Sequence, residues 1–79
     1  EKIEPWPARA RVFPNPFDDF LFVEGDRAKK VYLLGADGSF IARAEGALKF
    51  FTADLPAGLY ILRIFFEGNR QEAFFVIKK

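Results

Sequence analysis

The sequence predicts an all-β domain, a sandwich of seven short antiparallel strands. Apolar residues alternate with a period of two, and no window keeps the i, i+3, i+4, i+7 spacing of an amphipathic helix for two turns. Glycine, proline or polar turns recur at spacings of about 8 to 12 residues, as they do in small sandwiches. Eleven phenylalanines supply large apolar side chains for a core. A small open barrel is the alternative architecture for the same pattern.

The expected strands are short and lie between clear turn signals. They cover residues 11–13, 20–24, 30–34, 39–45, 48–52, 59–66 and 71–78. The first ends at Pro14, Asn15 and Pro16, and it is expected at a sheet edge because proline cannot donate a hydrogen bond to a ladder. The second ends at Gly25 and Asp26, which are typical turn residues.

Each later strand also ends at residues that favour a turn. Asp37 followed by Gly38 predicts a tight hairpin after the third strand, because both residue types can adopt a positive φ. Gly46 ends the fourth strand, and residues 54–58 turn the chain from the fifth strand into the sixth. Residues 68–69, a glycine and an asparagine, then connect the sixth strand to the seventh. These turns have the spacing expected of an antiparallel fold.

The sixth strand shows the clearest division into two faces. Tyr60, Leu62 and Ile64 share one face by the period of two and are expected in the core, whereas Arg63 points the other way. Three pairs of adjacent phenylalanines each place one ring on either side of their strand: Phe50 and Phe51, Phe65 and Phe66, and Phe74 and Phe75. Either turns and the N-terminal segment cover the outer rings, or these rings mark a contact surface.

The composition narrows the functions that the chain can have. Twelve basic and eleven acidic residues leave a net charge of +1 without a basic stripe, which argues against a nucleic-acid partner. No apolar run approaches the roughly 18 residues of a membrane span. Because the chain has no cysteine and no histidine, disulfides and the common nucleophilic triads are excluded. The adjacent Asp18 and Asp19 are expected in a solvated turn. No catalytic, cofactor-binding or metal site is assigned, and the chain is not expected to be an enzyme.

The chain divides into a short linker and one domain. Residues 1–10, with Pro5 and Pro7 around Trp6, are expected to form an extended linker, and residues 11–79 form the domain. Trp6, Tyr32 and Tyr60 are candidates for a sugar-stacking platform, as small sandwich modules use. Tyr60 lies in phase with core residues, however, which favours a structural role for it.

In their order and spacing, several of these segments resemble the C-terminal sorting domain of type IX secretion cargo proteins from bacteria of the Bacteroidota. The resemblance covers residues 11–79. The residues that carry it are Pro14, Asn15 and Pro16, Gly38 in the hairpin, Gly58 and Tyr60 of a Gly-x-Tyr motif, and a basic end at Lys78 and Lys79. The chain departs from the family in its last strand, where Phe74 and Phe75 stand at positions that are commonly more polar.

The resemblance implies an immunoglobulin-like sandwich and a non-catalytic secretion signal. In that family the domain directs an attached N-terminal cargo domain through the outer membrane and is recognised by the outer-membrane type IX translocon. A sortase-like cysteine peptidase usually removes it during surface anchoring. The implied localisation is the periplasm in transit, and then the outer membrane, the cell surface or the medium. A retained immunoglobulin-like accessory domain, for glycan binding or interdomain packing, is the alternative.

The last strand is the expected recognition element. A strand at a sheet edge offers unpaired backbone groups, to which a partner can add a strand of its own. The residues assigned to this element are Phe74, Phe75, Val76, Ile77, Lys78 and Lys79. The same edge predicts that the isolated domain forms a homodimer by pairing or exchanging edge strands.

Overall fold

The structure is a computed structural model that describes residues 10–25 and 27–79. The expected linker, except for Ala10, and the expected turn residue Asp26 lie outside the described residues. The strands are β1 (Ala10–Phe13), β2 (Phe20–Gly25), β3 (Ala28–Gly35), β4 (Phe40–Glu45), β5 (Lys49–Phe51), β6 (Gly58–Phe66) and β7 (Arg70–Lys78). The described residues form no helix, and therefore none that is long and apolar enough to cross a membrane.

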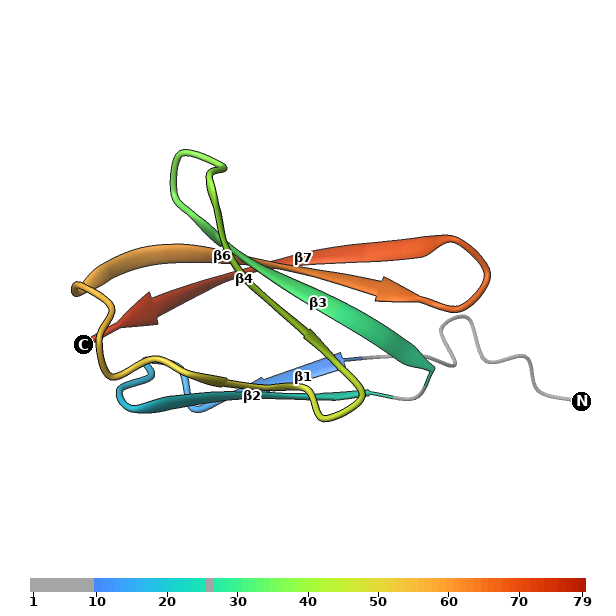
Figure 1. Cartoon of the computed structure of the whole chain (residues 1–79), viewed down its shortest axis with the longest axis horizontal. Coiled ribbons are helices and arrows are strands. Elements are labelled where there is room, and N and C mark those ends of the chain that lie inside the picture. The colour runs from blue at the N-terminus through green and yellow to red at the C-terminus, as the bar shows by residue number, and fades with distance from the viewer. Residues whose placement is uncertain (1–9, 26) are drawn as a thin grey trace, which may run out of the picture.

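The predicted fold class, a seven-stranded antiparallel β-sandwich, is confirmed. One sheet has the order β1-β2-β5, and the other has the order β4-β3-β6-β7. All strand pairs within the two sheets are antiparallel. The two sheets face each other across the core (Figure 1). In a constant-type immunoglobulin domain the fourth strand joins the first, second and fifth strands, whereas here β4 pairs with β3.

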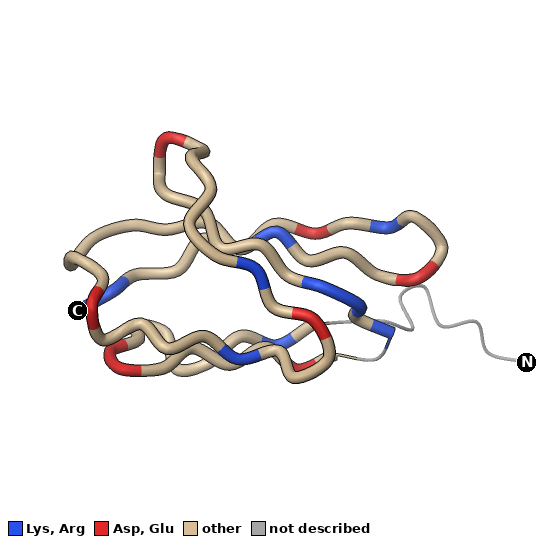
Figure 2. Tube along the Cα trace, viewed as in Figure 1, with Lys and Arg blue, Asp and Glu red and all other residues tan. Residues whose placement is uncertain are grey.

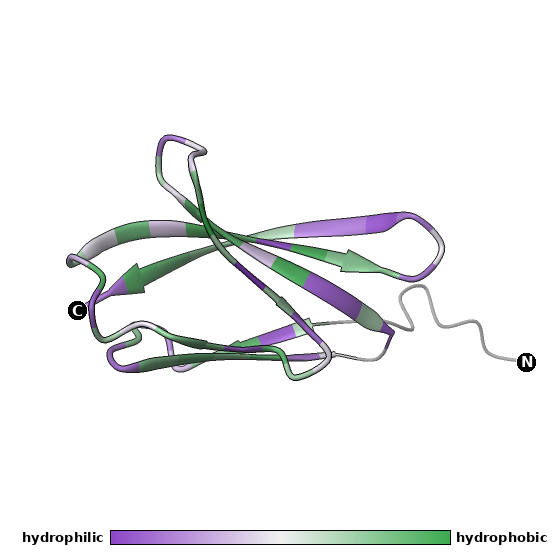
Figure 3. Cartoon of the chain, viewed as in Figure 1, coloured by the Kyte–Doolittle hydropathy of each residue, from purple (hydrophilic) through white to green (hydrophobic). Residues whose placement is uncertain are grey.

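The core lies between the two sheets and follows the period of two. Tyr60, Leu62 and Ile64 are buried as predicted, and the neighbouring Arg63 is exposed. The buried apolar residues are Phe17, Leu21, Val23, Val31, Leu33, Ala44, Phe50, Tyr60, Leu62, Ile64, Phe66 and Val76. Figure 3 shows apolar residues along the strands of both sheets. Basic and acidic residues are scattered over both sheets, and the residues drawn in colour form no basic stripe (Figure 2).

The predicted hairpin joins β3 to β4. Gly38 has the positive φ, 89°, but Asp37 does not adopt one. Instead the Asp37 carboxylate accepts hydrogen bonds from the backbone N–H of Ser39 at 3.0 Å and from its hydroxyl at 2.7 Å. The backbone hydrogen bond from Ser39, followed by the one from its hydroxyl, lowers the pKa of Asp37 below 3.8. The Asp37 side chain therefore stabilises the turn by hydrogen bonds, and of these two residues only Gly38 supplies the left-handed conformation.

Candidate functional site: the edge strand β7

The candidate recognition strand lies at an edge of the four-stranded sheet. β7 pairs with β6 from Gly58 opposite Lys78 to Phe66 opposite Arg70. Its other side faces away from the sheet, because β7 is the last strand in the order β4-β3-β6-β7. Such a strand has a row of backbone groups without a partner strand, so the state of those groups decides whether the edge can bind another chain.

The six predicted recognition residues do not share one surface. Phe75 and Ile77 point away from the core and are 68% and 50% exposed, and Lys79 is also exposed. Val76 is fully buried between the sheets, Phe74 is half-buried, and Lys78 is only 6% exposed. A partner can therefore contact Phe75, Ile77 and Lys79 without unfolding the domain, whereas Val76 and Lys78 belong to its interior.

The second half of the β7 edge is closed by residues 15–17. The backbone N–H of Phe17 donates to the carbonyl of Ile77 at 2.8 Å, and the N–H of Lys79 donates to the carbonyl of Phe17 at 2.9 Å. The side-chain oxygen of Asn15 accepts a hydrogen bond from the backbone N–H of Ile77 at 3.0 Å. These bonds form a short parallel bridge to β7. Residues 15–17 thus take the place that an added strand would occupy at Ile77 and Lys79.

An ion pair holds the same end of β7. The ammonium of Lys78 lies 3.6 Å from a carboxylate oxygen of Asp18, and it also donates weakly to the main-chain oxygen of Lys79 at 3.5 Å. The Lys78 side chain is 6% exposed, whereas that of Asp18 is 64% exposed. Lys78 was predicted to be part of a basic terminus. The structure instead buries its stem and directs its charge to Asp18, which leaves Lys79 as the accessible cation.

The first half of the β7 edge is open. Residues that face each other in an antiparallel ladder alternate between hydrogen-bonded and non-bonded pairs. Because the N–H and carbonyl of Ile77 point away from β6, those of Gln71, Ala73 and Phe75 point the same way. Among the described residues, no backbone group pairs with these three. The described residues therefore leave the edge free between Gln71 and Phe75 and close it from Ile77 onward.

Gly58 and Tyr60, the residues of the Gly-x-Tyr motif, lie near the closed half of the β7 edge, and Tyr60 contacts the ring of Phe17. This ring is fully buried and meets the Tyr60 ring edge to face, with 6.0 Å between their centroids. The Tyr60 hydroxyl donates to the carbonyl of Pro56 at 2.6 Å, which resembles the tyrosine corner of immunoglobulin-like domains. Gly58 begins the strand with a φ of 146°, a conformation that is almost exclusive to glycine. Gly58 and Tyr60 therefore fix the turn into β6, and Tyr60 contacts Phe17 of the segment that closes the edge.

Sequence reasoning missed two residues of this region. Phe17 lies in a turn between prolines and aspartates, and its one signal is an apolar residue in a polar segment. Thr52 is fully buried, its hydroxyl donates to the carbonyl of Asp18 at 2.6 Å, and its N–H donates to the carbonyl of Asp19 at 2.7 Å. The two aspartates lie in an exposed turn as expected. Thr52 joins that turn to the end of β5.

A second apolar surface lies on the outer face of the three-stranded sheet. Four phenylalanine rings form a continuous row there: Phe13, Phe22, Phe20 and Phe51, with centroid distances of 5.6, 6.1 and 5.4 Å between successive rings. Phe51 is 65% exposed. The guanidinium of Arg11 and the ammonium of Lys49 lie over the rings of Phe13 and Phe20. This aromatic row is the main alternative to β7 as a contact surface.

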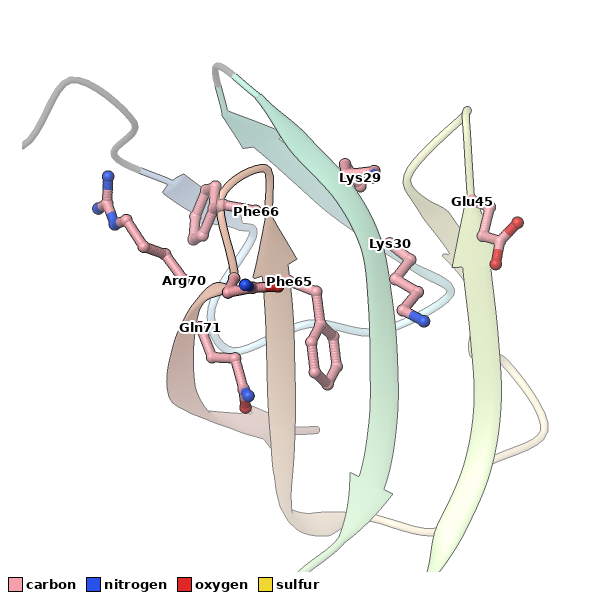
Figure 4. A pocket seen from close by; sticks show the side chains of 8 residues that line it. Lys29, Lys30, Glu45, Phe65, Phe66, Arg70 and Gln71 are labelled. Carbon is pink, nitrogen blue, oxygen red and sulfur yellow. The ribbon is translucent and has the colours of Figure 1, made fainter.

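An open hollow of about 590 Å³ lies on the four-stranded sheet beside the β6–β7 turn, where β6 ends and β7 begins (Figure 4). Its lining residues are Lys29, Lys30, Glu45, Phe65, Phe66, Asn69, Arg70 and Gln71. The ammonium of Lys30 lies 5.3 Å from the centre of the Phe65 ring and 5.6 Å from that of Tyr32. Lys30 is thus held against two aromatic rings, as a cation–π contact that stabilises the outer face of the sheet.

The candidates for a sugar-stacking platform are not brought together. Trp6 lies outside the described residues, Tyr32 lies on the outer face of β3, and Tyr60 is buried with its hydroxyl bound to Pro56. Within residues 10–25 and 27–79, no three acidic residues gather as ligands for a metal ion. Gly38 lies in the β3–β4 hairpin and contributes to neither contact surface.

Fold and surface together define a small antiparallel β-sandwich, in which the described residues cover only half of the edge strand β7. Comparison of the chain with family models, curated proteins and solved structures found no match.

Proposed function

We propose that this chain is a non-catalytic sorting module that directs an attached cargo protein through the outer membrane by type IX secretion. The sequence resemblance in residues 11–79 suggests this function. The observation that carries the proposal is the position of β7 at a sheet edge, with Phe75 and Ile77 exposed beside it. An address must be readable while the domain stays folded, and an edge strand with exposed apolar side chains offers both backbone and side-chain contacts to a receptor.

Apolar residues extend from this edge onto the outer face of the sheet. Ile77 lies opposite Leu59, and Phe75 lies opposite Ile61. Leu59 is 47% exposed, so that this corner offers an apolar patch next to the backbone of β7. Contiguous apolar surface on a small domain is typical of a binding site for another protein. In the proposal, the outer-membrane translocon contacts this corner, and a sortase-like peptidase then cuts before the domain.

The direct test is a fusion of residues 1–79 behind a periplasmic reporter in a host with a type IX system. The expected result is reporter outside the outer membrane, detected by protease accessibility in intact cells. An otherwise identical host that lacks the translocon is the control, and there the reporter should stay in the periplasm. Reporter that stays in the periplasm of both hosts would rule the proposal out.

Deletion of residues 76–79 is a poor variant for this purpose. It removes the buried Val76 and Lys78 and the hydrogen-bond partners of Phe17, so loss of export would also follow from unfolding. A matched pair of substitutions avoids this problem. Phe75→Ser and Phe51→Ser change rings of nearly equal exposure, 68% and 65%, on different sheets. We expect Phe75→Ser to reduce export and Phe51→Ser to leave it intact.

A retained accessory domain that packs against a neighbouring domain is the second candidate function. The observation that favours it is the aromatic row of Phe13, Phe22, Phe20 and Phe51 on the outer face of the three-stranded sheet. In that case the reporter fusion is not exported, and Phe51→Ser loosens the contact between the domain and its neighbour. The same two variants therefore distinguish the two functions.

A further inference from the structure

The open half of the β7 edge offers a strand-addition site of defined length and chemistry. The backbone N–H and carbonyl groups of Gln71, Ala73 and Phe75 point away from β6 without a partner among the described residues. Beyond Phe75 the Asn15 side chain and the backbone of Phe17 take the positions of an added strand. As far as the described residues extend, a chain that pairs with β7 therefore finds room opposite residues 71–75, the length of a short peptide segment.

The side chains of the outer face supply the selectivity of this site. Arg63 lies opposite Ala73 on the neighbouring strand and is exposed. Its Nε donates to the side-chain oxygen of Gln71 at 3.1 Å, and no carboxylate forms an ion pair with it among the described residues. The Ala73 side chain is only a methyl group, so it leaves space above β7. The two terminal nitrogens of the Arg63 guanidinium can therefore extend across β7 toward an added strand. Adjacent strands lie about 4.8 Å apart, so an added strand would lie roughly 9.6 Å from β6. The Arg63 side chain and a facing acidic side chain together cover that distance.

We propose that the open half of β7 binds a short extended strand of a partner protein, with an acidic residue opposite Ala73 and an apolar residue opposite Phe75. The acidic residue pairs with Arg63, and the apolar residue packs on Phe75 and Ile61, which face each other. The inference rests on the proposed function in taking β7 as the strand that the receptor contacts. Beyond that function, it specifies which residue types the bound segment carries: an acidic residue opposite Ala73 and an apolar residue opposite Phe75.

A second copy of this chain fits the same edge less well. Antiparallel pairing of two β7 strands about Ala73 would place the Arg63 side chains of both copies on the same outer face, on either side of the paired alanines. Like charges in that arrangement oppose association. Pairing over five residues also buries much less than the roughly 800 Å² per partner of a stable interface. A short segment with an acidic and an apolar residue complements the charge of Arg63 and matches the length of the open edge, residues 71–75.

The test is selection of binding peptides from a display library of random eight-residue peptides on the folded 79-residue chain. We expect the selected peptides to carry Asp or Glu two positions from an apolar residue. Ala73→Pro removes one outward N–H without removing a bond to β6, because edge strands accept proline there. The Ala73→Pro variant should bind these peptides with an affinity lower by about tenfold or more, which corresponds to about 1.4 kcal/mol. Phe51→Ser should not weaken them.

Arg63→Glu provides a second variant that does not alter the backbone. Selection on Arg63→Glu should replace the acidic preference by Lys or Arg at the same position. The inference is wrong if no peptide is selected, if selected peptides bind Ala73→Pro as tightly as the original chain, or if their binding depends on Phe51. A concentration-dependent dimer that Ala73→Pro abolishes would also contradict it, because the occupant would then be a second copy.

The outcome separates this inference from the proposed function, because peptide binding needs no export. Peptides that bind as expected, together with a reporter fusion that stays in the periplasm, would contradict only the secretion role. Conversely, normal export of a fusion that carries Ala73→Pro and folds would contradict strand addition at β7 and leave the secretion role intact.

Discussion

The side-chain oxygen of Asn15 accepts a hydrogen bond from the backbone N–H of Ile77 at 3.0 Å, across 62 positions of the sequence. This bond joins the turn after β1 to the end of β7, and Phe17 continues the contact with two backbone hydrogen bonds. An exposed edge strand is a liability for aggregation unless part of it is covered. Here residues 15–17 cover the second half of β7, and no described residue covers the first half.

Replacing Asn15 should weaken this closure. Asn15→Ala removes the acceptor for the Ile77 N–H, and we expect a loss of about 1 kcal/mol in the free energy of unfolding, measured by denaturant titration. Asn15→Asp keeps an acceptor oxygen in place and serves as the control. Equal stability of Asn15→Ala and the original chain would show that the hydrogen bond contributes nothing to closure.

The Tyr60 hydroxyl should contribute to stability through its bond to the carbonyl of Pro56. Tyr60→Phe keeps the buried ring and leaves that carbonyl without its partner, so the free energy of unfolding should fall by about 1 kcal/mol. In a domain of this size the midpoint of thermal unfolding would fall by about 4 to 8 °C. Tyr32→Phe is the matched control, since the Tyr32 hydroxyl has no hydrogen-bond partner among the described residues. Similar shifts for both variants would contradict the assignment.

Gly58 should be required for its conformation and not for space. Its φ is 146°, and a Cβ at this position would meet no atom within 4 Å. Gly58→Ala should therefore cost about 1 to 3 kcal/mol from the backbone alone. The variant is expected to melt earlier in a calorimeter while its circular dichroism spectrum at low temperature stays that of the original domain. Unchanged stability would mean that the turn accepts another φ.

Substitutions of Lys78 and of Asp18, which form an ion pair, should change the free energy of unfolding by different amounts. Lys78→Met replaces a buried charge by an apolar side chain of similar length, so stability should stay within about 1 kcal/mol or rise. Asp18→Asn leaves the Lys78 ammonium without its carboxylate, and stability should fall. Urea denaturation of both variants gives the comparison. If Lys78→Met proves less stable than Asp18→Asn, the ion pair is worth more than the burial of its lysine costs.

The Asp37 carboxylate should make a small, pH-dependent contribution to folding. Hydrogen bonds from Ser39 lower its pKa below 3.8 in the folded state. The stabilisation is therefore present at pH values above 3.8 and is lost as the pH falls through the lowered pKa. Ser39→Ala removes the hydroxyl but keeps the backbone N–H, so the Asp37 pKa should rise in part toward 3.8 in an NMR titration. No rise would assign the shift to the backbone bond alone.

The period of two predicted the faces of β6, since Tyr60, Leu62 and Ile64 are buried and Arg63 is exposed. Such alternation is a local property of the chain and can be read from neighbouring residues. The burial of Phe17 was not predictable in this way, because one apolar residue in a turn has no period. Its contacts depend on how distant strands meet, and the same holds for the bond between Asn15 and Ile77.

The candidate site was predicted in position but not in detail. The apolar last strand indicated an edge that can bind a partner, and β7 lies at such an edge. Sequence alone could not divide that edge into a closed and an open half, because the division depends on residues 15–17. It also could not show that Lys78 is buried, since a lysine is buried only where tertiary structure brings a partner such as Asp18 to it.

Both proposals depend on a β7 strand whose edge is closed at Ile77 and open at Ala73 and Phe75. Amide hydrogen exchange of the 79-residue chain, resolved by residue with NMR, measures this difference directly. We predict slow exchange for the N–H groups of Ile77 and Lys79, and fast exchange for those of Ala73 and Phe75. Equally slow exchange at all four positions would mean that the whole edge is already covered, and it would contradict the account of β7 as a half-open binding strand.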